Sequence, residues 1–186
     1  MRTELDKIIA NIKPLCKTAM DEAKKHQAKL AKPPGSLGKL EDISVQLAGI
    51  TGKVHNSIEK KHLLVFAADN GVVAEGVASA PQSVTLKQAI NLTKEKTGAS
   101  VLAAHIGCGI TVCDVGINAD VKNSDVIDKK IAYGTNNIAN GSAMTKEQAI
   151  KAIITGVGLA KSTDADIIGV GEMGIGNTTT ASAVLS

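Results

Sequence analysis

The chain of 186 residues is long enough for one domain, or for one domain with a small appendage. Hydrophobic residues make up 44% but aromatic residues only 1%, so the core must be aliphatic, which fits layered α/β packing and argues against a base-stacking nucleic-acid platform. The formal net charge of +3 is too small to indicate a nucleic-acid or membrane-surface partner.

The cysteines and histidines indicate neither a disulfide framework nor a metal site. Cys16, Cys108 and Cys113 are odd in number and form no Cys-x-x-Cys pair, and no signal peptide is visible. We therefore expect reduced thiols in a cytoplasm. The four histidines show no ligand spacing, so we expect no metal and no cofactor.

The N-terminal segment reads as helical. Apolar residues recur at helical spacing from Leu5 to Ala23, and Pro14 either kinks this helix or begins a second one. The run KPPGSLG at 32–38 then interrupts the helical pattern. A short helix should follow, with one apolar face made of Leu40, Ile43, Leu47 and Ile50.

From residue 62 onward, strand-like and helical patterns alternate. Three apolar runs, at 62–71, 109–116 and 164–172, each end in a polar or glycine tip. Between them we predict helices at about 83–105, broken near Gly98, and at 145–161, which opens with the capping-box pattern Thr145-x-x-Gln148. The alternation predicts a parallel sheet covered by helices on both faces.

Polar residues end each predicted strand. Ligands of open parallel sheets bind beyond the carboxyl ends of the strands, so we expect Asp69, Asp114 and Glu172 to converge on one crevice. Asp69 could act as an acid/base group or bind a sugar hydroxyl; alternatively it is a turn former. The uncharged loop at 134–145 could hydrogen-bond a neutral or amphoteric ligand, or serve as a surface connection.

A glycine-rich stretch near the end of the chain raises the possibility of a phosphate site. Gly169-x-Gly171-x-x-Gly174 matches the dinucleotide fingerprint formally, but it follows the third predicted strand rather than the first. A strand followed by Gly174, Gly176 and a threonine-rich helix start would present N–H groups and hydroxyls to an anion. The alternative is a tight turn without a ligand. Glu172 would repel a phosphate, so it should face a hydroxyl or a cationic group.

Four segments together carry a family resemblance: KPPGSLGKLEDISVQLAGITG at 32–52, FAADNGVVAEGVASAPQSVT at 66–85, GTNNIANGSAMT at 134–145 and GEMGIGNTTTASA at 171–183. In this order they resemble the nicotinate-nucleotide:dimethylbenzimidazole phosphoribosyltransferases of cobalamin nucleotide-loop assembly, over essentially the whole chain. These enzymes transfer the phosphoribosyl group of nicotinate mononucleotide to 5,6-dimethylbenzimidazole and release nicotinate.

The resemblance implies an architecture. It implies a Rossmann-like α/β domain at 59–186 and a helical part of a small domain at 1–58, in a homodimer. The small domain of the family takes helices from both ends of the complete chain.

The resemblance also assigns site residues by position. Ser79, Ala80, Pro81 and Gln88 would border the benzimidazole pocket. The loop with Thr135, Asn136 and Asn137 would help to hold the nucleotide. The mononucleotide would be lined by Glu172, Met173, Gly174, Ile175, Gly176, Asn177 and Thr178, with Gly174, Gly176 and Asn177 near its phosphate.

This sequence departs from the family pattern in composition and in length. Asn70 stands where the family usually has histidine, Ala80 where an aromatic residue is frequent, and Ser142 where proline is usual. The family's catalytic glutamate and a phosphate-contacting lysine lie in a C-terminal part with no counterpart here, so we expect a fragment with little activity. Asp69 and Glu172 remain as catalytic candidates. A mononucleotide- or benzimidazole-binding module without catalysis, or a generic nucleotide domain, are the alternatives.

Overall fold

The computed structural model describes residues 2–122 and 124–186. Backbone contacts divide the chain into two compact units. One unit contains residues 6–58, and the other contains the residues through Leu5 together with 59–186.

The N-terminal unit is helical. It contains most of α1 (Arg2–Ala10), followed by α2 (Lys17–Gln27) and α3 (Lys39–Thr51). Residues 12–16, which include Pro14, are not helical, so the apolar pattern from Leu5 to Ala23 belongs to two helices, which was one of the two interpretations of Pro14. The α2 helix ends at Gln27, before the Lys-Pro-Pro-Gly run, and this run, with positive φ at Gly35 and Gly38, keeps the chain non-helical until α3.

The apolar face predicted for α3 is not its buried face. Leu40, Ile43 and Ile50 are 63%, 50% and 62% exposed. The buried residues of α3 are instead Val45, Ala48 and Gly49, and Val45 and Ala48 form a small core with Ala19 and Ala23 of α2. Small side chains let two helix backbones approach closely, and the sequence spacing alone did not show which stripe would meet a partner.

The second unit is built on a parallel sheet. Its strands are β1 (Lys61–Ala68), β2 (Cys108–Gly116), β3 (Ile127–Asp128) and β4 (Ile167–Met173), and their order is β3-β2-β1-β4. The three predicted strands are confirmed. The two-residue β3 was not predicted because a pairing over Cys113↔Ile127 and Asp114↔Asp128 is too short to leave a period in the sequence.

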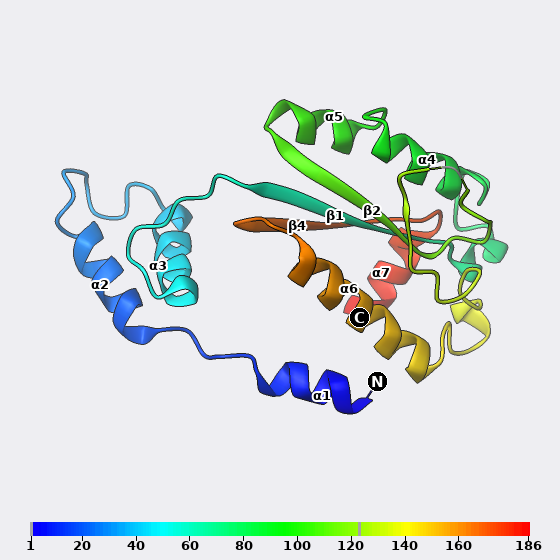
Figure 1. Cartoon of the computed structure of the whole chain (residues 1–186), viewed down its shortest axis with the longest axis horizontal. Helices are drawn as coiled ribbons and strands as arrows, with labels where there is room; N and C mark the ends of the chain where they lie inside the picture. Colours follow the sequence, from blue (N-terminus) through cyan, green and yellow to red (C-terminus); the bar gives the residue numbers. More distant parts are fainter. Residues whose placement is uncertain (1, 123) are drawn as a thin grey trace. The chain divides into compact units, whose positions relative to one another are not determined.

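Helices cover both faces of this sheet, as predicted, and the fold is a Rossmann-like α/β fold. In Figure 1, α4 (Val84–Thr93) and α5 (Gly98–His105) lie on one side of the strands, and α6 (Lys146–Ser162) and α7 (Asn177–Leu185) lie on the other. Val65 and Ala67 of β1 pack with Ala89 and Leu92 of α4 in the main core. Phe66 points the opposite way, as the two-residue period of a strand requires.

The helix boundaries follow local capping. The predicted helix at 83–105 is broken at 94–97, and α5 begins after Thr97, which forms a capping box with Ser100. The box predicted for α6 is also present: Thr145 Oγ1 accepts from Gln148 N, and Gln148 Oε1 accepts from Thr145 N. A short 3₁₀ turn, η1 (Gly71–Glu75), follows β1, and another, η2 (Ile138–Asn140), precedes α6.

The strand order places a topological switch point between β1 and β4. The chain moves from β1 to β2 and β3 on one side, and then returns across β1 to β4 on the other side. Loops at such a point leave the sheet in opposite directions and open a crevice between them. The crevice here is formed by the segments that follow Ala68 and Met173.

Two of the three strand-end carboxylates, Asp69 and Asp114, are buried inside the fold, and Asp114 does not reach this crevice. Asp114 is fully buried, its Oδ1 accepts from the amides of Gly116 and Ile117, and its Oδ2 accepts from Lys130 Nζ at 2.6 Å. Lys130 also donates to the Ile117 and Ala119 carbonyls. The expectation that Asp114 lines the crevice was therefore wrong, because its charge is needed to close the loop after β2.

Loss of the Lys130 cation should destabilise the second unit. Lys130→Met leaves the buried Asp114 carboxylate without its counter-charge, and such a loss lowers the free energy of unfolding by about 3–5 kcal/mol. Lys129→Met, the same change at an exposed side chain, is the matched control and should shift it by less than about 0.5 kcal/mol. Urea denaturation followed by circular dichroism measures both, and equal effects would contradict the role given to Lys130.

Candidate functional site

The site at the switch point is defined by a very close approach of two backbones. A Cβ atom added to Gly174, just after β4, would lie 2.0 Å from the carbonyl oxygen of Ala68 at the end of β1. No side chain fits there, so only glycine allows the turn at 174–177 to lie against the end of β1.

The loop at 134–137 approaches the same region from the other side. A Cβ atom on Gly71 would lie 2.5 Å from the Thr135 carbonyl oxygen, and the Gly71 amide donates to Thr135 Oγ1 at 3.1 Å. The Thr135 amide donates to the Asp69 carbonyl at 3.0 Å. Two of the segments predicted to bind the nucleotide, 134–137 and 174–177, thus flank residues 69–71.

Asn70 connects these segments. Its Nδ2 donates to the Ile175 carbonyl at 3.2 Å, and its Oδ1 accepts from Thr180 Oγ1 of α7 at 3.1 Å. Its own carbonyl accepts from Gln82 Nε2 at 3.2 Å. Because one bond needs an N–H donor and another needs an acceptor, the amide orientation of Asn70 follows from the hydrogen-bond network.

Thr85 of α4 holds the other side of the same turn. It is fully buried, and its Oγ1 accepts from the Ile175 amide at 3.0 Å. The Asn177 amide donates to the Gly174 carbonyl at 3.0 Å, which closes the turn and starts α7. The Ile175 N–H is therefore bonded within the protein and is not among the groups that an anion could use.

A cavity of about 490 Å³ opens beside this turn. It is lined by three of the predicted substrate residues, Glu172, Met173 and Asn177, together with Asn70 and Thr180, and by apolar residues of β1, β2 and α7. Its volume is in the range of small-ligand sites. The Glu172 carboxylate accepts a hydrogen bond from Asn177 Nδ2, so this carboxylate is oriented across the mouth of the turn.

A second cavity, of about 260 Å³, lies beneath the loop at 134–137. Thr135, Asn136 and Tyr133 contribute to its lining. The Tyr133 hydroxyl donates to Asp120 at 2.7 Å; this bond raises the pKa of the tyrosine and lowers the pKa of the aspartate. Tyr133 is therefore held protonated, as a donor to a fixed anion. Asn137 is turned away, with its Nδ2 on Glu75 at 2.6 Å.

Asp69, one of the two catalytic candidates, is only 2% exposed. Its Oδ2 accepts from the Asn118 amide at 2.8 Å, while Oδ1 is buried without a hydrogen-bond partner. The Asp69 amide donates to the Gly116 carbonyl at 2.9 Å, so the residue ties the end of β1 to the end of β2.

The residues predicted for the benzimidazole pocket lie on the segment that leads into α4. The Pro81 carbonyl accepts from the Val84 amide at 3.0 Å, and Ser79 and Ala80 precede it in the loop. Gln88 lies one helical turn after Thr85, and its Oε1 accepts from Asn91 at 3.2 Å. This segment meets the glycine turn through Gln82 and Thr85.

Four side chains at the turn were not among the predicted site residues: Asn70, Gln82, Thr85 and Thr180. Sequence reasoning noted Asn70 only as a departure from the family pattern. Thr85 carried one usable signal, because a threonine in the first turn of an otherwise buried helix face needs a hydrogen-bond partner. The turn that supplies this partner lies 90 residues further along the chain.

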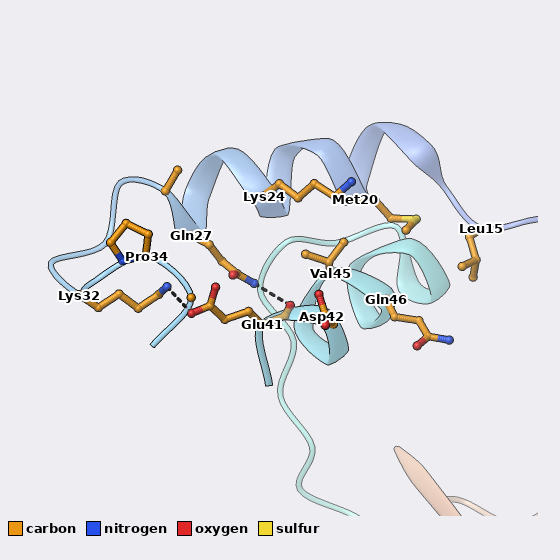
Figure 2. A pocket seen from close by; sticks show the side chains of 12 residues that line it. Leu15, Met20, Lys24, Gln27, Lys32, Pro34, Glu41, Asp42, Val45 and Gln46 are labelled. Atoms are coloured by element: carbon orange, nitrogen blue, oxygen red, sulfur yellow. Dashed lines mark hydrogen bonds and ion pairs between the residues drawn. The ribbon is translucent and has the colours of Figure 1, made fainter. Parts of the chain in front are cut away.

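The N-terminal unit has a larger cavity of its own, of about 640 Å³, between α2 and α3 (Figure 2). Lys32 and Glu41 form an ion pair of 2.7 Å at one end, and hydrogen bonding to Lys32 lowers the pKa of Glu41. Gln27 donates to the Glu41 carbonyl at 2.9 Å. None of the predicted substrate residues lines this cavity, so its size alone does not make it the candidate site.

Residues 2–122 and 124–186 contain neither a metal-binding cluster nor a membrane-spanning helix. No group of three or more His, Cys, Asp or Glu side chains among them could hold a metal ion. No helix in this part of the chain is long and apolar enough to cross a membrane.

Comparisons with known proteins agree on one family. A phosphoribosyltransferase family model matches residues 12–186. A nicotinate-nucleotide–dimethylbenzimidazole phosphoribosyltransferase of Clostridium tetani is 46% identical over 185 residues, which cover 98% of this chain and 51% of that protein. One from Clostridium perfringens strain 13 is 50% identical over 184 residues, covering 97% and 51%.

The solved structures agree with the sequence relatives. The enzyme of the same name from Thermus thermophilus superposes with a TM-score of 0.85 at 35% identity, covering 90% of this chain and 52% of that chain. The chain thus spans about half the length of the relatives it matches.

Sheet order and site place the chain in a class before any relative is considered. A β3-β2-β1-β4 parallel sheet with a glycine turn at its switch point defines a Rossmann-like α/β protein, and a cavity of about 490 Å³ lies beside that turn. The chain belongs to the phosphoribosyltransferase family described by the matching model. Gly169 and Gly171 lie in β4 and pair with Leu63 and Val65 of β1. The formal dinucleotide fingerprint is therefore not a loop motif here.

Replacing Gly174 should disrupt the site and the fold together. Gly174→Ala forces the ends of β1 and β4 apart and should lower the free energy of unfolding by about 3 kcal/mol, the upper end for overpacking. Gly158→Ala in α6, where an added Cβ meets nothing within 4 Å, is the control and should raise it by about 0.5–1 kcal/mol. Thermal or urea unfolding gives the comparison, and the same sign for both would contradict the close approach.

Proposed function

We propose that the chain carries the nicotinate mononucleotide site of an enzyme that transfers a phosphoribosyl group to 5,6-dimethylbenzimidazole, with α-ribazole 5′-phosphate and nicotinate as products. The observation that carries this proposal is the glycine turn at 174–177, which closes the switch-point crevice of a phosphoribosyltransferase-family chain. The names of the relatives supply the substrates.

We assign the ribosyl phosphate to the start of α7. The first turn of a helix has amides without intrahelical partners, and the N-terminal end of the helix dipole favours an anion. Gly176 and Thr178 offer their amides there and Thr178 its hydroxyl, while Asn177, whose amide closes the turn on the Gly174 carbonyl, borders the site. Glu172 precedes the turn. One oxygen of its carboxylate accepts from Asn177 Nδ2, and we assign the other to a ribose hydroxyl.

The transfer requires little acid catalysis. A ring nitrogen of dimethylbenzimidazole attacks the anomeric carbon with inversion, the glycosidic bond to nicotinate breaks, and its electron pair neutralises the pyridinium nitrogen. The new benzimidazolium then loses its ring N–H proton to a base. We place the benzimidazole against the loop with Ser79, Ala80 and Pro81 and against Gln88, the segment that meets the glycine turn.

A second candidate is a binding module that holds these ligands without turnover. The observation that favours it is the state of the two carboxylates. Asp69 is buried and bonded to Asn118, and Glu172 is bonded to Asn177, so neither is placed as a free base. Under both candidates we propose a homodimer in the cytoplasm; the support is the family resemblance and three free thiols.

The two candidates are separated by binding and product measurements on the same sample. Calorimetry with nicotinate mononucleotide should show binding, and chromatography with both substrates should show product at a rate lower by roughly 10²–10⁴ than that of a full-length relative, the usual contribution of a general base. Binding with no product at all favours the module.

Turnover at the rate of a full-length relative would contradict the reasoning about the carboxylates. It would place the base among these residues, and Glu172→Gln against Asp69→Asn would identify it. Tighter binding of NAD or ATP than of nicotinate mononucleotide would instead favour a generic nucleotide domain.

A further inference from the structure

The turn that closes the proposed phosphate site is fixed by side chains to which the proposed function gives no role. The backbone N–H and C=O of Ile175 are both bonded to these side chains. The N–H donates to Thr85 Oγ1 at 3.0 Å, and the carbonyl accepts from Asn70 Nδ2 at 3.2 Å. Asn70 follows β1 and Thr85 lies in the first turn of α4, so two separate elements hold one residue of the turn.

We propose that Asn70 and Thr85 are positioning residues that clamp Ile175 and thereby hold the turn at 174–177 in the form that receives the ribosyl phosphate. The inference rests on the proposed function, because it takes the phosphate at this turn as given. Thr85 is fully buried, and Asn70 borders the cavity with both polar atoms of its side chain already bonded to the protein. In this proposal both residues act through the backbone of the turn.

The chemistry of the turn explains why a clamp is needed. Gly174 and Gly176 leave the backbone with wide conformational freedom, and ordering it only when the ligand arrives would weaken binding. With Ile175 bonded on both sides, the turn is ordered in the free protein. The amides of Ile175 and Asn177 are bonded within the protein, so the remaining backbone N–H groups of the turn are left for the phosphate.

Asn70 suits this role because it connects the turn to α7. Its Oδ1 accepts from Thr180 Oγ1 at 3.1 Å while its Nδ2 holds Ile175, so the turn and the helix are held by the same amide. Its Nδ2 also lies 2.8 Å from where a Gly174 Cβ would be, which shows how closely the amide packs on the turn. An aspartate could accept from Thr180 but could not donate to Ile175.

The test compares two ligands that differ only in the phosphate. Binding of nicotinate mononucleotide and of nicotinate riboside is measured for the unaltered chain and for the variants Asn70→Leu and Thr85→Val, neither of which adds a charge that would itself repel the phosphate. We expect mononucleotide affinity to fall about five- to tenfold in each variant, the loss typical of one hydrogen bond, with riboside affinity changed less than about twofold. Thr85→Ser, which keeps the acceptor, should retain the affinity, and Asn56→Leu, at an exposed side chain of the N-terminal unit, is the control.

A role in stability alone predicts another pattern. The affinities for the mononucleotide and the riboside would then fall by the same factor, or neither would fall, whatever the change in melting temperature. Either result would overturn the inference. Hydrogen exchange gives a readout that needs no ligand: the Ile175 amide should be protected in the unaltered chain and should exchange at least about tenfold faster in Thr85→Val. Unchanged exchange in that variant would also overturn it.

Failure of the proposed function gives a different signature. An unaltered chain that binds the mononucleotide no more tightly than the riboside would remove the phosphate from this turn, and the clamp's role in binding with it. In that case the Ile175 amide would still be protected from hydrogen exchange in the unaltered chain and would still exchange faster in Thr85→Val. Both results depend only on the bonds to Ile175.

Discussion

The close contact between the backbone at Gly174 and the carbonyl of Ala68 is the constraint on which the rest of the site depends. It brings together the ends of β1 and β4, the two strands at which the sheet order reverses. The side-chain bonds to Ile175, the start of α7 and the cavity beside Glu172 all follow from it. A turn displaced by one methyl group could not make these contacts, because protein interiors have little free volume to absorb it.

The carboxylates at the strand ends show how the fold divides its polar groups between structure and chemistry. Asp69 and Asp114 are buried and accept backbone amides from the loop after β2, and Asp114 is neutralised by Lys130. Buried carboxyl groups require hydrogen-bond partners, and both residues take theirs from the loop after β2, although Asp69 Oδ1 has none. Glu172 is exposed on β4 and lines the cavity beside the glycine turn.

Much of the fold could be predicted from the sequence, because strand runs, capping boxes and proline breaks are local signals. The strands ending near Asp69 and Glu172 and the start of α6 at Thr145 are of this kind. The buried face of α3 and the fate of Asp114 were not predictable, since both depend on which surface meets which partner. The glycine turn was visible as a motif, but the residues that hold it lie 90 and 105 positions away along the chain.

Shared dependence on one turn has a consequence for how this region can vary. Residues 70, 85 and 174 meet at a single turn, so the effect of changing one depends on the identity of the others, and their free-energy effects will not add. A chain with a different residue at 70 must hold Ile175 by another donor or shift the turn. Positions distant in sequence are therefore expected to change together among relatives, and a substitution tolerated in one background can be rejected in another.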